Sequence, residues 1–521
     1  MTRIRTEAFR VSASRLQKLS KRKRRIQYRL RERAWAPQDR PMFTASNIHY
    51  ELADRVRGLG PGGIGARHHL AGRVGLIDAR DRRLRLLKIH LPYHESDHVL
   101  NVAHNILCGG TCLEDLELRR NDEVYLDALG AQRIPDPTTA GDFCRRFTSE
   151  HVEILPDTLN DVRLGVWRQQ PPAFFDRAIL DVDGVLAETY GECKEGSGLA
   201  YNGTWGYPPL VVSLAQTQEP LYLANRAGNR PSHEGAAAYL DKALALCRRA
   251  GFKSLLLRGD TDFSQTEHRD RWDTAGVHFL FGRDTVRNLV RIAEYLPKSA
   301  WRRLHRPPQY HRQSPPRPRP ANVKEQLVVA HGYKTIKLPG EAVAAFRYRP
   351  TACRKTYTVV VLRQDLAVAQ GQLRLFADVR YFFYLTNLPD SSPADVVLLA
   401  NDRCNQENLL EQLRNGVQAL RLPVDNLVSN WAYLVMASLA WSRKAWFALL
   451  LPERGRWKEK YRHEQRQVLT MEFKRFVKAF IRVPCQIVRA GRRIIYRLLA
   501  WNPWQAVFVR GLAALDCPRR C

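Results

Sequence analysis

The stretch Ile179–Gly191, ILDVDGVLAETYG, constrains the fold more than any other part of the chain. Apolar and acidic residues alternate over Leu180, Asp181, Val182 and Asp183, which predicts a short strand with both aspartates on one face. Two carboxylates that converge at the end of a strand repel each other, and burial raises the pKa of one of them unless a cation neutralises the pair. The pattern therefore predicts a Mg²⁺ site, with a pair of solvated turn aspartates as the alternative.

The charge of the chain indicates a polyanionic partner. The 521 residues suffice for two to four domains and include 83 Lys and Arg against 52 Asp and Glu, a net charge of +31. Residues 1–40 hold 14 basic and 3 acidic residues, and residues 452–521 hold 17 and 5. Because the excess is concentrated at both ends, we expect the ends to bind nucleic acid, with an anionic membrane as the second candidate.

Cysteine usage and hydropathy predict a reduced, cytoplasmic protein without a membrane span. The ten cysteines form no CxxC pair, and the N-terminal residues lack the apolar core of a signal peptide. Cys108 and Cys112 have the spacing of a zinc half-site or of one helix face, and the absence of a matching pair nearby favours the helix face. The most apolar stretch, 431–451, is interrupted by Arg443 and Lys444, which predicts a buried helix.

The N-terminal third is predicted to be helical and basic. Residues 1–57, with KRKRR at Lys21–Arg25, read as a basic arm, and residues 58–170 show helical periodicity, as expected of a DNA-binding domain. Within it, IPDPTTAGDFCRRF predicts a loop, an N-cap at Thr138 or Thr139, and a short helix. That helix carries Arg145 and Arg146 and is interpreted either as a recognition helix or as a plain surface helix.

Residues 171–300 are predicted to form an α/β core. Strands are expected at 178–186, 210–215, 221–225, 253–258 and 277–281, with helices at 234–250 and 265–274. Three strands, a helix, a strand, a helix and a strand is the order of an RNase H-like mixed sheet flanked by helices. In that order Asp183 and Asp260 end neighbouring strands, so their carboxylates are expected to share metal ions.

The remaining segments are predicted from composition. Residues 301–375 combine a linker rich in Pro and Arg with a β-rich module inserted into the core. Residues 376–451 return to the core with a helix over Asn401–Gly416, whose Arg403, Glu407 and Arg414 form one stripe, by itself typical of an exposed face. Residues 452–521 form a basic tail whose alternating aromatic and basic residues suit a DNA-contacting or a membrane-surface helix.

Three blocks of sequence together resemble the DDE transposases of bacterial insertion sequences, most closely the thirteen-eighty group. They are LDVDGVLAETYG with the downstream KEG and NG near Gly196 and Gly203, LLLRGDTDF around Asp260, and NDRCNQENLLEQLR around Glu407. The resemblance runs from about Glu95 to Trp446 and leaves both basic ends uncovered. It implies an RNase H-like core with a β insertion before the last acidic residue.

The resemblance also implies the site and its partners. Asp183, Asp260 and Glu407 would bind two Mg²⁺ ions, or Mn²⁺ in their place, with Asp181 as the rival for the first position. DNA contacts would come from Arg403 and Arg414, and the tyrosine of the family's Tyr, Arg, Glu, Lys order is replaced by Ala400. The expected enzyme cuts double-stranded DNA at terminal inverted repeats and joins it to target DNA, as a homodimer at the bacterial nucleoid and with no membrane partner.

Two other functions fit parts of the sequence. The motif DVDGVL also resembles the first motif of haloacid-dehalogenase-like phosphatases, in which Asp181 would be the nucleophile and Asp183 the acid and base. That interpretation leaves the net charge and the helix of Glu407 unexplained. A DNA-binding relic of a transposase that no longer cuts is the second alternative. The distance of Glu407 from the two aspartates distinguishes the transposase from the phosphatase.

Overall fold

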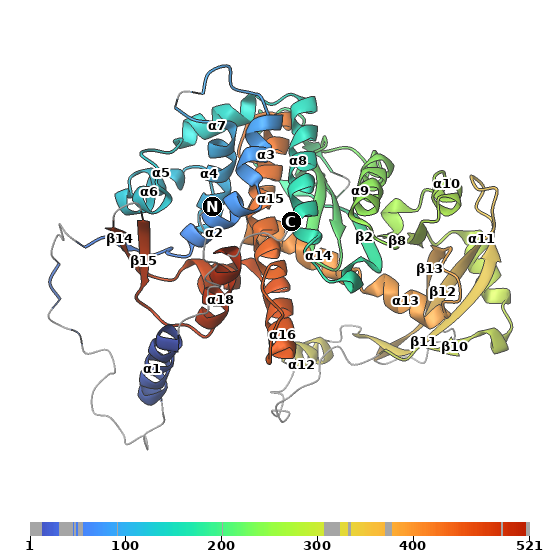
Figure 1. The fold of residues 1–521 in the computed structure, drawn as a ribbon. Coiled ribbons are helices and arrows are strands. Elements are labelled where there is room, and N and C mark those ends of the chain that lie inside the picture. The colour runs from blue at the N-terminus through green and yellow to red at the C-terminus, as the bar shows by residue number, and fades with distance from the viewer. Residues whose placement is uncertain are drawn as a thin grey trace, which may run out of the picture.

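The computed structural model describes residues 13–30, 45, 48–50, 56–90, 92–200, 202–306, 323–331, 335–369, 378–490 and 493–516. Within these ranges a nine-stranded mixed sheet forms the centre of the fold, in the order β10-β11-β12-β13-β9-β8-β2-β6-β7 (Figure 1). Five of these strands form the core sheet: β2 (Arg177–Gly184), β6 (Leu210–Leu214), β7 (Glu219–Ala224), β8 (Ser254–Gly259) and β9 (His278–Arg283).

The core sheet has the RNase H-like topology that the sequence predicts. β2 pairs antiparallel with β6 and parallel with β8, β8 pairs parallel with β9, and β6 and β7 form a hairpin. β6 and β7 are buried at every position. Burial on both faces explains the apolar runs in β6 and β8, whereas β2 keeps the alternation of apolar and acidic residues over Leu180–Asp183 that the sequence shows.

The strands of the predicted β-rich insertion extend the core sheet. β13 (Asp378–Thr386) pairs antiparallel with β9, and β12 (Tyr357–Ala369), β11 (Thr335–Tyr348) and β10 (Arg302–Arg303) follow outward. Pairing with β9 satisfies the backbone groups of an otherwise open edge, which favours this arrangement over an isolated module. Most of the segment rich in Pro and Arg lies outside the described residues.

Helices cover both faces of the sheet. α9 (Ala236–Ala250) packs on β2, β6, β7 and β8, and α13 (Pro393–Asn401) packs on β9, β11, β12 and β13. α15 (Leu427–Leu449) contacts β7, and its side chains are buried from Ala432 to Leu449, as predicted. None of the helices in the described ranges combines the length and the apolar composition needed to cross a bilayer. The remaining helices beside the sheet are α10 (Arg269–Thr274), α11 (Arg287–Tyr295), α12 (Val323–Ala330) and α14 (Cys404–Glu411).

The N-terminal helices and the C-terminal segment form one unit around α15. Both parts pack on α15, and β14 pairs with β1 on one side and β15 on the other. A Cβ on Gly63 would lie 1.8 Å from the carbonyl oxygen of Phe480, so this approach of the two segments requires glycine. The N-terminal elements are α1 (Ala13–Leu30), β1 (Gly58–Leu59), α2 (Ile64–Arg73), α3 (Leu76–Arg83), α4 (Glu95–Leu107), α5 (Leu116–Arg120), α6 (Glu123–Leu129), α7 (Pro137–Arg145) and α8 (Ser149–Trp167), and the C-terminal ones are α16 (Lys458–Leu469), α17 (Phe473–Phe476), β14 (Cys485–Ala490), β15 (Arg493–Leu498) and α18 (Gln505–Asp516).

Two local predictions are corrected by the structure. The RRIIYRLLAW segment, predicted as a surface helix, contains strand β15, whose backbone bonds to β14. α7 begins after Asp136, whose side chain accepts a hydrogen bond from the amide of Thr139, and not at Thr138 or Thr139. Aspartate followed by proline at the first helical position is the better start signal, because Asp136 satisfies a free amide and Pro137 loses no hydrogen bond.

Candidate active site

Asp183 and Asp260 lie side by side at the carboxyl ends of two parallel strands. β2 buries Leu180 and Val182 on one face, which leaves Asp181 and Asp183 on the other. Asp260 follows the last residue of β8, and its carboxylate accepts a hydrogen bond from the amide of Asp262 at 3.0 Å. The parallel register of β2 and β8 therefore brings the two carboxylates to one edge of the sheet.

Arg403 bridges the two carboxylates. Its Nη1 lies 2.9 Å from Oδ2 of Asp183, and its Nη2 lies 3.0 Å from Oδ2 of Asp260. Burial raises the pKa of Asp183 to about 7, opposed by the charge of Arg403 and reinforced by that of Asp260. Burial also raises the pKa of Asp260, again against Arg403. One guanidinium thus offsets the repulsion of two partly buried carboxylates.

Asp181 has a different partner. Its two carboxylate oxygens accept hydrogen bonds from Nε and Nη2 of Arg258 at 2.7 and 2.8 Å, and both side chains are buried. Nη1 of Arg258 donates to the carbonyl oxygen of Leu399, at 2.7 Å, near the end of α13. Burial raises the pKa of Asp181, and the hydrogen bonds and charge of Arg258 oppose this rise. The pair holds α13 against the sheet and leaves Asp183 as the carboxylate that meets Arg403.

Glu407 lies one helical turn after Arg403, and its side chain is exposed. The predicted helix 401–416 is in fact divided: α13 ends at Asn401, α14 starts after Arg403, and a π turn follows at Gln412–Gly416. The break places Arg403 at the N-cap of α14, with its side chain on the two aspartates. Among the described residues no three Asp, Glu, His or Cys side chains are grouped closely enough to hold a metal ion.

The donor set nevertheless fits a divalent cation. Two carboxylates converge at 2.9 and 3.0 Å on a positive group, which marks the space between them as a cation site. Oxygen ligands of this type are those that Mg²⁺ and Mn²⁺ prefer. In this structure the guanidinium of Arg403 lies between the two carboxylates. Glu407 follows Arg403 by four residues, so it lies one turn further along on the same side of α14.

The other predicted DNA contacts are dispersed. Arg414 lies in the π turn and donates to the carbonyl oxygen of Leu186, two residues beyond β2, at 2.7 Å. Arg145 is bound to Asp142 at 2.9 Å and to Asp425 at 3.0 Å. Arg146 follows α7 and is exposed, and Ala400 is half-buried on α13. Arg414 is therefore the one of these residues that bonds to the segment directly after β2.

Sequence reasoning did not identify Arg258 or the fit of Gly259. A Cβ on Gly259 would lie 2.8 Å from the ring of Phe281, so any larger residue there would force that ring to shift. Arg258 precedes Asp260 by two residues, as Asp181 precedes Asp183. Because the two strands are parallel neighbours, this equal spacing could have predicted that Arg258 pairs with Asp181. Ser232 adds a further contact at the edge, because its hydroxyl donates to Asp262 at 2.9 Å.

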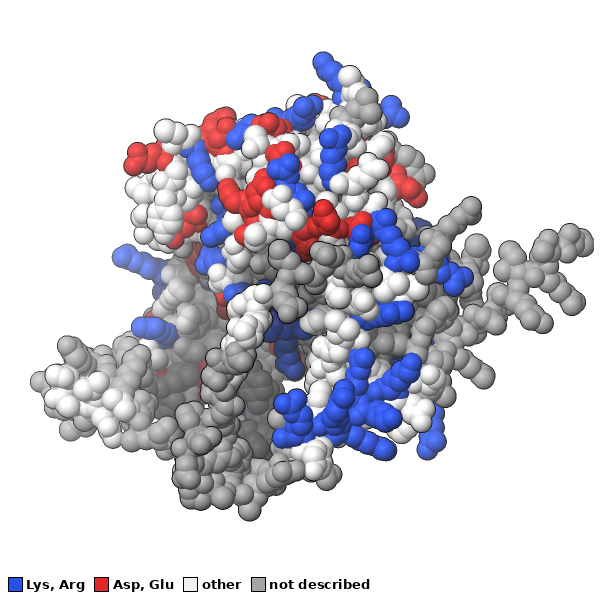
Figure 2. All heavy atoms as spheres, turned by 90° about the vertical axis from the view of Figure 1, so that its left-hand side faces the viewer, with Lys and Arg blue, Asp and Glu red and all other residues white. Residues whose placement is uncertain are grey.

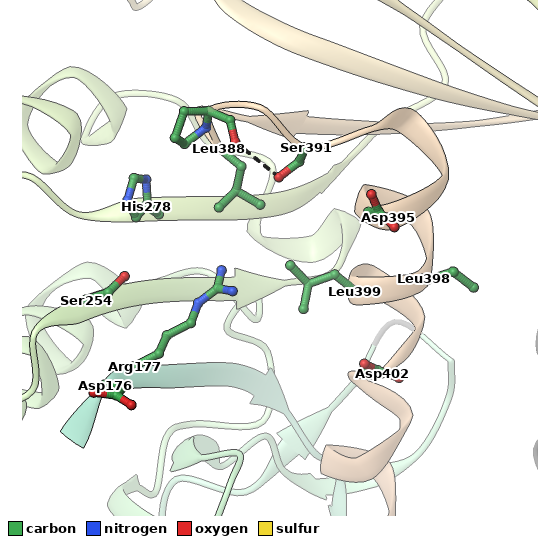
Figure 3. Close-up of a pocket in the computed structure, with 11 residues that line it drawn as sticks. Asp176, Arg177, Ser254, His278, Leu388, Ser391, Asp395, Leu398, Leu399 and Asp402 are labelled. Atoms are coloured by element: carbon green, nitrogen blue, oxygen red, sulfur yellow. Dashed lines mark hydrogen bonds between the residues drawn. The ribbon is translucent and has the colours of Figure 1, made fainter. Parts of the chain in front are cut away.

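A cavity of about 560 Å³ opens at the other end of the same sheet face. It is lined by Arg177, Ser254 and His278, near the starts of β2, β8 and β9, by Asp395 of α13 and by Asp402 directly after that helix (Figure 3). Neither Asp183 nor Asp260 lines it. Its mixture of acidic, basic and apolar side chains matches no single class of ligand.

Comparison with known proteins gives a family match and one structural similarity. Residues 88–519 match the family described as "Transposase DDE domain group 1", so the match includes the predicted C-terminal tail. A cryo-EM structure of a piggyBac transposase synaptic complex with hairpin DNA has a TM-score of 0.31 and 12% sequence identity, covering 80% of this chain and 82% of that one. No curated protein sequence matches the chain.

Proposed function

This chain belongs to the DDE transposase domains of group 1, and we propose that it is the transposase of a bacterial insertion sequence of the thirteen-eighty group. Members of this family are phosphoryl-transfer enzymes that use divalent metal ions and transpose DNA by cleavage and strand transfer. The finer assignment is supported by the blocks around Asp183, Asp260 and Glu407.

We propose Asp183, Asp260 and Glu407 as the catalytic carboxylates, holding two Mg²⁺ ions. The observation that carries this proposal is the convergence of Asp183 and Asp260 on one cation at adjacent strand ends. When bound, the metal ions activate water or a 3′-hydroxyl and stabilise the leaving oxygen. Glu407 would complete the set from the helix turn that follows Arg403, where its side chain is exposed.

Arg403 has two tasks in this proposal. It compensates the charge of Asp183 and Asp260, a role that bound metal ions would take over. Its guanidinium would then be available to bind a DNA phosphate beside the reacting bond, which suits its planar pair of donors. Arg414, fixed to the Leu186 carbonyl, contributes a second positive charge at the same edge. The Asp181–Arg258 pair positions the strand and α13 but does not touch the substrate.

The phosphatase alternative does not fit this architecture. A nucleophilic Asp181 must be free to attack, whereas both of its oxygens bond to Arg258 inside the protein. The strand following β2 in the sheet order, β6, is antiparallel, as in an RNase H-like sheet. The relic alternative makes a different prediction, that DNA is bound but never cut, and the experiment below separates it from an active enzyme.

We further propose that the enzyme binds two transposon ends and target DNA as a homodimer at the nucleoid. The basic arm at 1–57 and helices of 58–170 would hold duplex DNA, with Arg145 and Arg146 as contacts at the end of α7. The core is formed by 171–300 and 376–451 with 301–375 inserted, and 452–521 supplies further positive charge. The support is the net charge of +31 and its concentration toward both ends.

Glu407→Ala tests the catalytic proposal. We expect its strand nicking in Mg²⁺ or Mn²⁺ to fall by orders of magnitude, while its gel shift of transposon-end DNA equals that of the parent. Glu411→Ala is the matched control, because Glu411 is also exposed on α14 but one turn further on. Unchanged nicking by Glu407→Ala would remove this residue from the site. Absence of nicking by the parent protein, with DNA binding intact, would support the relic.

A further inference from the structure

The connection between α15 and α16 forms a protruding hairpin with an unusual surface composition. Leu449 is the last residue of α15, and the side chain of Gln465 donates to its carbonyl oxygen at 3.5 Å. Arg462 donates to Glu453 at 3.4 Å. α16 thus runs back along the connection, and residues 454–460, RGRWKEK, lie at the turn. We call this segment the α15–α16 tip.

The tip exposes one tryptophan among several cations. Trp457 is 55% exposed, and the guanidinium of Arg456 lies 5.4 Å from its ring. Arg454, Arg456 and Lys458 are exposed as well. Glu459, the one acid of the segment, is bound to Arg462 at 3.0 Å. The tip therefore carries a net positive charge beside the solvent-exposed ring of Trp457.

The base of the tip is held rigidly by ion pairs and ring contacts. Arg510 of α18 bonds to Glu464, and its guanidinium lies 3.9 Å from the ring of Tyr461. Arg462 bonds to Glu453 and Glu459. The charged residues of the base are thus held in ion pairs, whereas Arg454, Arg456 and Lys458 of the tip are exposed. A fixed base with exposed cations at its tip suits a binding surface, because a segment that is already positioned loses less conformational entropy when it binds a partner.

Other basic residues lie at the same edge of the molecule as the tip. Figure 1 shows α16 and α1 at the lower edge of the fold. Figure 2, turned about the vertical axis, shows Lys and Arg gathered in the lower part of that face and Asp and Glu in the upper part. An extended polyanion bound along the lower edge would therefore meet α1 and the tip and avoid the acidic surface.

We propose that the α15–α16 tip is a contact site for duplex DNA, in which Arg454, Arg456 and Lys458 bind phosphates and Trp457 stacks on a base at a deformable step. Cations and an aromatic ring on one protrusion suit DNA because each phosphate takes a cation and each base offers a stacking face. Pyrimidine–purine steps such as TA unstack most easily. This proposal rests on the proposed function, because it assigns an additional contact to the same DNA.

The test measures binding of full-length protein to a labelled duplex of mixed sequence with TA steps, at several salt concentrations. For Arg454→Ala/Arg456→Ala/Lys458→Ala we expect the slope of log affinity against log salt to flatten by about 3. For Trp457→Ala we expect affinity to fall about 10-fold with the slope unchanged, and Trp457→Phe to recover most of it. Permanganate should oxidise a thymine at a TA step with the parent protein and with Trp457→Phe but not with Trp457→Ala.

The matched control uses α11, which also exposes an aromatic ring among cations. Tyr295 is 82% exposed, and Arg287, Arg291 and Lys298 are exposed around it. The corresponding single and triple alanine variants should leave the affinity and slope unchanged. Equal effects of both sets, or tip variants that bind like the parent, would overturn the proposal. A parent protein that binds no DNA at all would instead refute the proposed function.

Discussion

Arg403→Ala is the most informative perturbation of the site, because one side chain compensates two carboxylates. The substitution removes charge-assisted hydrogen bonds of 2.9 and 3.0 Å and leaves Asp183 and Asp260 facing each other, both partly buried. Removing one partner from a buried ion pair costs about 3–5 kcal/mol, and the partial exposure of this group places the expected loss near 3 kcal/mol.

The melting temperature converts this loss into a measurable shift. The unfolding entropy is about 2.1 cal/mol/K per residue, which for a chain of this length amounts to about 1.1 kcal/mol/K if it unfolds as one unit. A loss of about 3 kcal/mol then lowers the melting temperature in EDTA by about 3 °C. Arg145→Ala is the control, because Arg145 forms ion pairs of similar length on the surface, where their loss costs under about 1 kcal/mol.

Metal affinity should change in the opposite direction. Arg403 competes with a divalent cation for Asp183 and Asp260, so its removal should tighten Mn²⁺ binding by up to about 100-fold, the equivalent of about 3 kcal/mol. The electron paramagnetic resonance signal of free Mn²⁺ measures this affinity without DNA or turnover. Because the pKa of Asp183 is about 7, Mn²⁺ binding to the parent should weaken as pH falls below 7. Arg403→Ala that melts like the parent in EDTA and binds Mn²⁺ no more tightly would refute the reasoning.

Two further predictions concern charge elsewhere in the chain. Lys444 is fully buried, and its ammonium lies 3.5 Å from the ring of Trp441. Burial lowers the pKa of Lys444 well below 10.5. Because Lys444→Met removes this buried polar group, it should raise the free energy of unfolding by at least about 1 kcal/mol. Lys444 takes up a proton in the unfolded chain but not in the folded one, so the free energy of unfolding of the parent should fall as pH drops below 10.5. Urea unfolding should therefore show a smaller difference in this free energy between pH 7 and pH 10 for the variant than for the parent. Deleting residues 1–30 should flatten the salt dependence of DNA binding, and an unchanged slope would show that the arm and α1 do not contact phosphates.

The order of the core strands was predictable because it depends on local patterns. Apolar runs bounded by turn residues give β2, β6, β7, β8 and β9, and their succession selects one sheet topology. The choice between Asp181 and Asp183 was less accessible, because alternation places both on one face. Their partners support the proposed choice of Asp183: Asp181 pairs with Arg258 in the parallel register, and Asp183 reaches Arg403.

The remaining errors come from long-range packing. Neither Pro nor Gly marks the break at Asp402–Arg403, so helical periodicity continued through it. β15 reads as an amphipathic basic segment, and only its partner β14, itself joined to β1, makes it a strand. The close approach at Gly63 likewise depends on residues more than four hundred positions away. These contacts have no local signature.

The pairing of β1 with β14 makes the order of synthesis matter. Gly63 donates its amide hydrogen to the carbonyl oxygen of Ile481, so the first helices remain incomplete until nearly the whole polypeptide has left the ribosome. At about 5–20 residues per second this delay lasts roughly 20–80 s. During that time the nascent N-terminal helices expose apolar surface and an unpaired strand edge to chaperones and proteases. A message cut short near its 3′ end would therefore yield a fragment whose first helices lack the partner on which their core depends.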